Sequence, residues 1–178
     1  MTDSEREFIT QQLQRGRNAL TAAIAGASEA QASFRPESGR WSIADCVEHV
    51  AITEGALYQL VTGGVANPDG ISLDPTKYHR LADAMLDRSR KVVAPERARP
   101  TGRFASIEEA ARQFLTARDR SMAFARDCDD DLRRLFCLHP LFGEMDCYRC
   151  LIMLALHPAR HAAQIEEIKQ AAAGYASV

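Results

Sequence analysis

Several features that would place this chain of 178 residues in a particular functional class are missing from it. Lysine and arginine form no block or aromatic-interleaved stripe, and the formal net charge is only -2, so nucleic acid is not an expected partner. No apolar run approaches the roughly 18 residues of a membrane span, and the first seven residues are polar where a signal peptide would be apolar. We therefore expect a soluble, cytoplasmic protein with no membrane partner.

Disulfide bonds and β-strands are also not expected. The five cysteines are an odd number in a chain without an export signal, which favours reduced thiols. Cys147 and Cys150 form a Cys-x-x-Cys pair that we interpret as two small core residues, since no βαβ pattern surrounds it, and Cys46 is a possible contact of a bound metal. No segment alternates convincingly with the period of two that indicates a strand.

Four long segments do show the three- and four-residue spacing of apolar residues that predicts amphipathic helices. These predicted helices span about 4–27, 43–61, 107–127 and 147–172. Ser42 with Asp45 and Ser106 with Glu109 are capping-box pairs at the second and third starts, and Asp146 can cap the fourth helix. Length favours one domain over residues 1–178 with a substantial core.

A long connection separates the second and third predicted helices. Turn signals at 67–70 and 74–75 and prolines at 95 and 100 interrupt about 40 residues, within which residues 77–93 are predicted to form one short helix. So long a connection usually crosses the molecule or covers a functional site, and it permits the two helices to run parallel. The predicted fold is all-α: a four-helix bundle with a long crossover between helices two and three.

Three histidines fall on two of these helices. His157 and His161 stand four residues apart, so both imidazoles leave one helix face about one turn apart, and nearby apolar residues indicate that this face is turned inward. Together with His49 they supply three nitrogen ligands and leave coordination positions open, which is typical of a catalytic metal. Imidazole favours zinc, nickel or another divalent transition ion over calcium or magnesium.

These residues also have ordinary interpretations. A single helical histidine such as His49 is more often a hydrogen-bonded, partly buried residue than a ligand, so a bundle without an ion stays an alternative. Pro158 lies inside the histidine pair and cannot donate to the Leu154 carbonyl. It either breaks the helix or kinks it and leaves that carbonyl facing the site.

Other polar residues near the histidines are harder to assign. Glu48 and Glu54 flank His49 but do not both share its helix face, so neither is assigned as a general base. Arg160 is interpreted first as a surface arginine, and second as a residue facing a neighbouring helix or an anionic substrate. His79 and His139 lie in connections and are predicted to face solvent.

The sequences WSIADCVEHV at 41–50, HPLFGEM at 139–145 and HPARHAAQI at 157–165 together resemble the DinB/YfiT-like superfamily. In that family a tryptophan precedes the helix that carries the first histidine, and a His-Pro-x-x-Gly-like loop precedes the last helix. A His-x-x-x-His-x-x-Gln-Ile pattern carries the other two histidines. The resemblance covers nearly the whole chain.

The resemblance implies a bundle with this crossover, a divalent-metal site formed by His49, His157 and His161, and a homodimer. It also implies a small-molecule substrate. Family members include thiol-dependent S-transferases or isomerases, and this is the activity we expect first, with nickel or zinc as cofactor and a low-molecular-weight thiol as cosubstrate. A metal-dependent hydrolase and a non-catalytic, stress-related metal-binding module are the alternatives.

Overall fold

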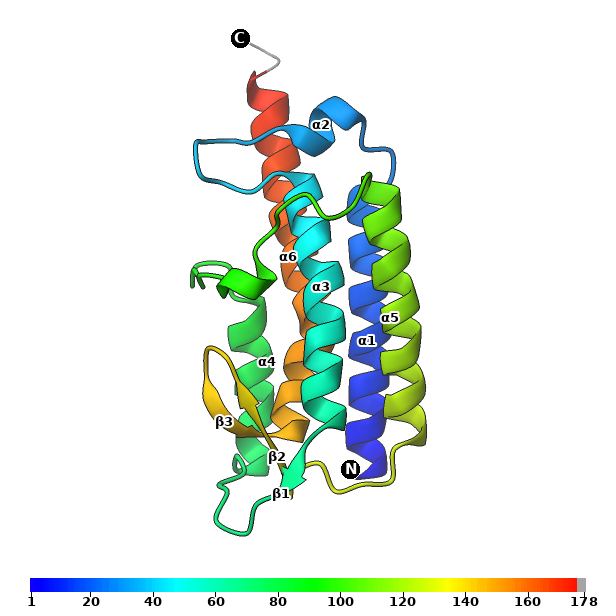
Figure 1. Cartoon of the computed structure of the whole chain (residues 1–178), viewed down its shortest axis with the longest axis vertical. Helices are drawn as coiled ribbons and strands as arrows, with labels where there is room; N and C mark the ends of the chain where they lie inside the picture. Colours follow the sequence, from blue (N-terminus) through cyan, green and yellow to red (C-terminus); the bar gives the residue numbers. More distant parts are fainter. Residues whose placement is uncertain (176–178) are drawn as a thin grey trace.

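The computed structural model describes residues 1–175, and four long helices form its main body (Figure 1). They are α1 (Asp3–Ile24), α3 (Ile43–Thr62), α5 (Ile107–Asp127) and α6 (Cys147–Tyr175). α1 and α6 run in one direction, and α3 and α5 run in the other. The predicted four-helix bundle, with its second and third long helices parallel, is confirmed. None of the helices formed by residues 1–175 combines the length and apolar character needed to cross a bilayer.

Side-chain caps fix where all four long helices begin, and the cap of α1 is Thr2, whose hydroxyl accepts from the Glu5 amide. The Ser42 hydroxyl accepts a hydrogen bond from the Asp45 amide, and the Asp45 carboxylate accepts from the Ser42 amide at 2.8 Å, which completes the predicted capping box. Ser106 caps α5 in the same way, although its partner Glu109 accepts from the Ala105 amide instead. The Asp146 carboxylate accepts from the amide of Arg149 and caps α6 as predicted.

The crossover between α3 and α5 contains α4 (Tyr78–Leu86), which packs along α6 outside the bundle, between the short turns η1 (Pro75–Lys77) and η2 (Glu96–Ala98). Another short helix, α2 (Glu29–Ser33), precedes α3. The helix predicted over 77–93 is therefore too long. It ends at Leu86 because the Asp87 carboxylate accepts from the amide and hydroxyl of Ser89, a turn that competes with helix.

A small antiparallel sheet lies at the lower end of the bundle, beside α3 and α6, and the prediction that strands are missing is wrong. Its strands are β1 (Val65–Ala66), β2 (Leu135–His139) and β3 (Gly143–Asp146), in the order β1-β2-β3. The strands are short, and Phe136 and Cys137 are both buried because β2 has protein on its two faces. Such a strand shows no alternation of apolar and polar residues.

The interior is divided into two apolar clusters along the bundle axis. Cys147 and Cys150 belong to the lower cluster and are fully buried, as predicted. Cys46 is fully buried in the upper cluster, and among the described residues the group that could hold a metal comprises the three histidines without it. α1 lies close against α6 at Gly16, where a Cβ atom would come within 2.9 Å of the Ala155 carbonyl oxygen. The lack of a side chain at Gly16 therefore allows α6 to approach α1 this closely.

Helix α6 continues through Pro158, so the interpretation that it breaks there is wrong. The Leu154 carbonyl, which Pro158 leaves without its usual donor, accepts from Nη2 of Arg118 on α5 at 3.1 Å. The same nitrogen donates to Glu54 of α3 at 2.7 Å, and the Ser121 hydroxyl donates to the other oxygen of that carboxylate. The freed carbonyl therefore belongs to a buried network of three helices and not to the histidine site.

Candidate metal centre

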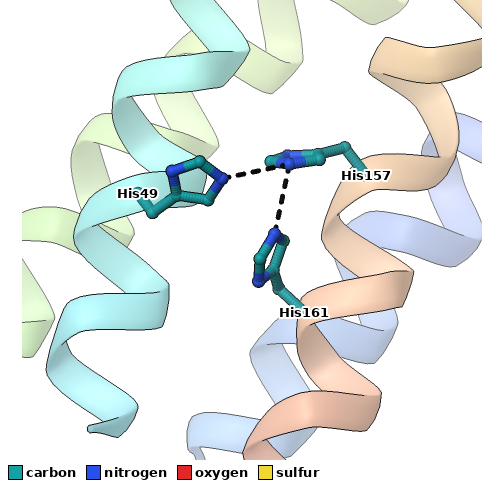
Figure 2. Close-up of side chains that lie close together, drawn as sticks. All are labelled: His49, His157 and His161. Carbon is teal, nitrogen blue, oxygen red and sulfur yellow. Dashed lines mark hydrogen bonds between the residues drawn. The ribbon is translucent and has the colours of Figure 1, made fainter. Parts of the chain in front are cut away.

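The three predicted histidines lie together where α3 passes α6, with their rings pointing toward one another (Figure 2). Nε2 of His157 is 3.2 Å from Nε2 of His49 and 3.1 Å from Nε2 of His161. One ring nitrogen from each of the three lies within 4.8 Å of the others. His49 and His161 are buried, and His157 is partly buried. The bundle therefore brings the whole predicted triad to one point.

The contacts of the three Nδ1 atoms fix which ring nitrogen carries the hydrogen. Nδ1 of His49 is 2.7 Å from the Ala98 carbonyl oxygen and Nδ1 of His161 is 3.0 Å from Oε1 of Gln164; both partners are acceptors, so each Nδ1 donates. Nδ1 of His157 is 3.2 Å from the Thr53 hydroxyl, which already donates to the His49 carbonyl. His157 therefore also donates through Nδ1.

With every Nδ1 carrying a hydrogen, the three Nε2 atoms present lone pairs to one another. In this tautomer neither of the two contacts dashed in Figure 2, at 3.2 and 3.1 Å, has a hydrogen between its nitrogens, so the lone pairs repel each other, and a cation placed among them removes that repulsion. Two nitrogens that bind one zinc ion at about 2.0–2.1 Å cannot be more than roughly 4.2 Å apart, and the two Nε2 distances to His157 meet this limit. The donor set fits a divalent transition metal.

Burial keeps the three rings neutral. Loss of hydration lowers the pKa of His157 and His161 well below the usual 6.5, and it lowers the pKa of His49 as well. For His157, repulsion from the positive charge that His161 and His49 would carry lowers the pKa further. The neutral imidazole is the form that binds a metal, so the folded protein holds the triad ready for an ion near neutral pH.

These pKa shifts predict how the stability of the metal-free protein depends on pH. A histidine whose pKa is lowered on folding binds more protons in the unfolded chain, so stability is complete above the unfolded pKa of 6.5 and is lost as pH falls toward the folded pKa. We expect the urea midpoint of chelator-treated protein to fall steadily below about pH 6.5. A His157→Ala/His161→Ala variant should show a shallower fall, and equal slopes would contradict the assignment.

Trp41, the residue before the capping serine of α3, covers one side of the triad. Its ring centroid is 4.8 Å from that of His49, and its ring stacks on His161 at 6.0 Å. Trp41 also lines a small pocket together with Arg40 and Gln164, and none of the three histidines lines it. The tryptophan thus packs against two of the imidazoles and helps to shield them from solvent.

The two glutamates near His49 are bonded to groups outside the triad. Glu48 is buried and accepts from the amides of Thr101 and Gly102 at 2.8 and 2.9 Å. Glu54 is held by the Arg118 guanidinium and the Ser121 hydroxyl. Both carboxylates are therefore committed to structural hydrogen bonds, and neither is placed as a general base.

Two predictions about polar residues are wrong. The first interpretation of Arg160, as a surface arginine, is wrong, and the second, that it faces a neighbouring helix, is confirmed: it is buried, and its guanidinium donates to the carbonyls of Met85, Asp87 and Arg90 at and just beyond the end of α4. His139 lies in β2 and is buried instead of facing solvent, because its ring stacks on Phe142 in the hairpin. His79 is exposed as predicted, although it lies on α4.

Sequence reasoning did not assign the hydrogen-bond partners of the histidines. Thr53 could have been found, because it lies four residues after His49 and so on the same helix face. Gln164 stands three residues after His161, which is also one turn away. Ala98 contributes only its backbone carbonyl, and a backbone group leaves no mark in the sequence.

Comparisons with known proteins agree with the fold. A family model described as the DinB superfamily matches residues 12–165. The solved structure of YfiT from Bacillus subtilis, described as a probable metal-dependent hydrolase with an unusual four-helix bundle topology, is 14% identical with a TM-score of 0.62, over 96% of this chain and 89% of that one. TT2238, described as a four-helix bundle protein, is 20% identical with a TM-score of 0.59, over 91% and 98%. A search of curated proteins gave no match.

Proposed function

This chain belongs to the DinB superfamily, and from that premise we propose that it is a metal-dependent enzyme that activates a small nucleophile at His49, His157 and His161. The observation that carries this proposal is the convergence of the three Nε2 atoms while each Nδ1 lies within hydrogen-bond distance of an oxygen elsewhere. Three protein nitrogens leave coordination positions open for other ligands, as at catalytic sites.

The chemistry divides between the ion and the protein. When bound, a divalent transition ion such as zinc or nickel supplies positive charge that makes water or a thiol available in ionised form near neutral pH. Thr53, Gln164 and the Ala98 carbonyl orient the three rings through their Nδ1 atoms. Trp41 covers His49 and His161 and excludes water from that side.

We propose a low-molecular-weight thiol as the nucleophile, in line with the activities implied by the family resemblance. The thiol sulfur would form a bond to an electrophilic carbon of a small-molecule substrate, the leaving group would depart with its electron pair, and the thiol proton would pass to solvent. Water is the second candidate, because the similar YfiT structure is described as a probable metal-dependent hydrolase. The expected homodimer stays part of this proposal.

A two-arm activity screen tests the proposal. In one arm, zinc- or nickel-loaded protein is mixed with common low-molecular-weight thiols and electrophilic substrates; in the other, it is mixed with esters and amides in water alone. We expect turnover in the first arm that requires both the thiol and the metal. The matched controls are chelator-treated protein and a His161→Ala variant, which should turn over neither set.

The outcomes separate the candidates. Turnover that depends on thiol and metal supports the transferase, whereas ester or amide cleavage without thiol supports the hydrolase and removes the thiol from the proposal. If metal-loaded protein with a full ion complement turns over neither set, the enzymatic proposal is overturned in favour of a metal-binding module.

A further inference from the structure

The end of the crossover, residues 87–103, is attached to the bundle beside the three histidines; we call this segment the connector. It joins α4 to α5 and contacts α3 through η2 (Figure 1). The connector forms hydrogen bonds with four residues of the bundle: Glu48, His49, Arg160 and Gln164. Each of these residues is a histidine of the triad or lies within three residues of one.

Arg160 holds the first part of the connector. It lies between His157 and His161 in sequence, and its buried guanidinium donates to the carbonyls of Met85, Asp87 and Arg90. Carbonyls at the end of a helix such as α4 have no partner within the helix, so this one arginine supplies the donors that they need. The helix that bears two histidines thus binds the start of the connector directly.

Arg88 reaches back to one of the histidines through Gln164. Its guanidinium pairs with Glu167 at 2.8 and 3.1 Å, and Nη1 donates to Oε1 of Gln164 at 3.4 Å. The same oxygen accepts from Nδ1 of His161 at 3.0 Å. Arg88 therefore holds the amide with its oxygen toward the imidazole, which keeps the His161 hydrogen on Nδ1 and the lone pair on Nε2.

The last part of the connector bonds to α3. The Ala98 carbonyl accepts from Nδ1 of His49 at 2.7 Å, and the amides of Thr101 and Gly102 donate to the buried carboxylate of Glu48. Arg103 also lies within 3.5 Å of that carboxylate. Thus the connector contributes a hydrogen-bond acceptor to one histidine and, through Arg88, positions the acceptor of a second.

We propose that the connector is the outer part of the metal centre: Arg88 is a positioning residue for His161, and metal binding and attachment of the connector stabilise each other. This inference rests on the proposed metal function. It follows from linkage, because contacts that orient ligand rings raise affinity for the ion, and the ion in turn stabilises the conformation in which those contacts exist.

The first test measures Zn²⁺ affinity by competition with a chelating dye. Arg88→Met should weaken binding about 10-fold and Gln164→Leu by about 10- to 100-fold, the range usual for hydrogen-bond partners of metal ligands. Lys91→Met is the matched control, because Lys91 is an exposed cation of the same segment and should change the affinity less than twofold. Circular dichroism confirms that each variant is folded. Equal affinities for the Arg88 and Lys91 variants would overturn the positioning role.

The second test follows amide hydrogen exchange with and without Zn²⁺. Removal of the ion should speed exchange of peptides covering 94–103 by about fivefold or more, since the Thr101 and Gly102 amides depend on the attached connector. Peptides from the middle of α5, residues 112–122, should not change. If exchange over 94–103 is unchanged in protein that binds Zn²⁺ through the triad, the coupling between metal binding and attachment of the connector is overturned, while the proposed metal function stands. If His157→Ala takes up as much Zn²⁺ as the unaltered protein, the proposed function fails, and this inference fails with it.

Discussion

Replacing His157 with alanine should lower the affinity for Zn²⁺ by more than about 100-fold, beyond the cost usual for partners of metal ligands. His157 is the central member of the triad, because its Nε2 lies 3.2 and 3.1 Å from the other two. Without this ring, His49 and His161 cannot surround an ion from three directions. Metal content after purification and competition with a chelating dye measure the loss.

The His157 result needs a control for histidines in general. His79 is exposed and far in sequence from the triad, so His79→Ala should retain the full metal content. Metal-free His157→Ala should still be folded by circular dichroism, because the other contacts of α6 do not involve the imidazole. Equal metal content in His157→Ala and unaltered protein would show that the triad does not bind the ion.

Replacing Glu54 with alanine should lower the free energy of unfolding by about 3–5 kcal/mol, the cost usual for breaking a buried ion pair. Arg118 is fully buried, and its Nη2 lies 2.7 Å from the Glu54 carboxylate. Without Glu54 the guanidinium would be left in the core with its charge uncompensated. Urea denaturation followed by circular dichroism measures the change.

A double variant separates the charge from the packing. Glu54→Leu/Arg118→Met removes both charges and fills much of the volume, so it should be more stable than Glu54→Ala. It should still be less stable than the unaltered protein, since the Leu154 carbonyl loses its donor, at a cost of about 1–3 kcal/mol. A loss below about 1 kcal/mol for Glu54→Ala would contradict the importance of the pair.

The parts of the fold that depend on local patterns could be predicted from the sequence. The apolar spacing indicated all four long helices, and the Ser42–Asp45 capping box marked the start of α3 to the residue. The four-residue spacing indicated the His157–His161 pair, and the resemblance to the DinB/YfiT-like superfamily implied that His49, on a second inward-facing helix, completes the triad. These features are visible because residues close in sequence share a helix face.

The parts that depend on distant contacts could not be predicted. The burial of Arg160 requires carbonyls from Met85 to Arg90, 70 to 75 residues earlier in the chain. Likewise β2 is a strand because it pairs with β1, about 70 residues away, and with β3. A pattern of side chains also does not reveal that the Ala98 carbonyl accepts from His49 or that the Leu154 carbonyl accepts from Arg118.

The missing hydrogen bond at Pro158 in α6 also limits how far α3 and α6 can shift along their axes relative to each other. Apolar surfaces tolerate a small axial shift, but a guanidinium bonded at once to a carboxylate on α3 and a carbonyl on α6 does not. Glu54 lies five residues, or about 7.5 Å, along α3 from His49. The axial position of His49 relative to His157 and His161 is therefore fixed by Arg118 of α5, a helix that carries none of the three histidines.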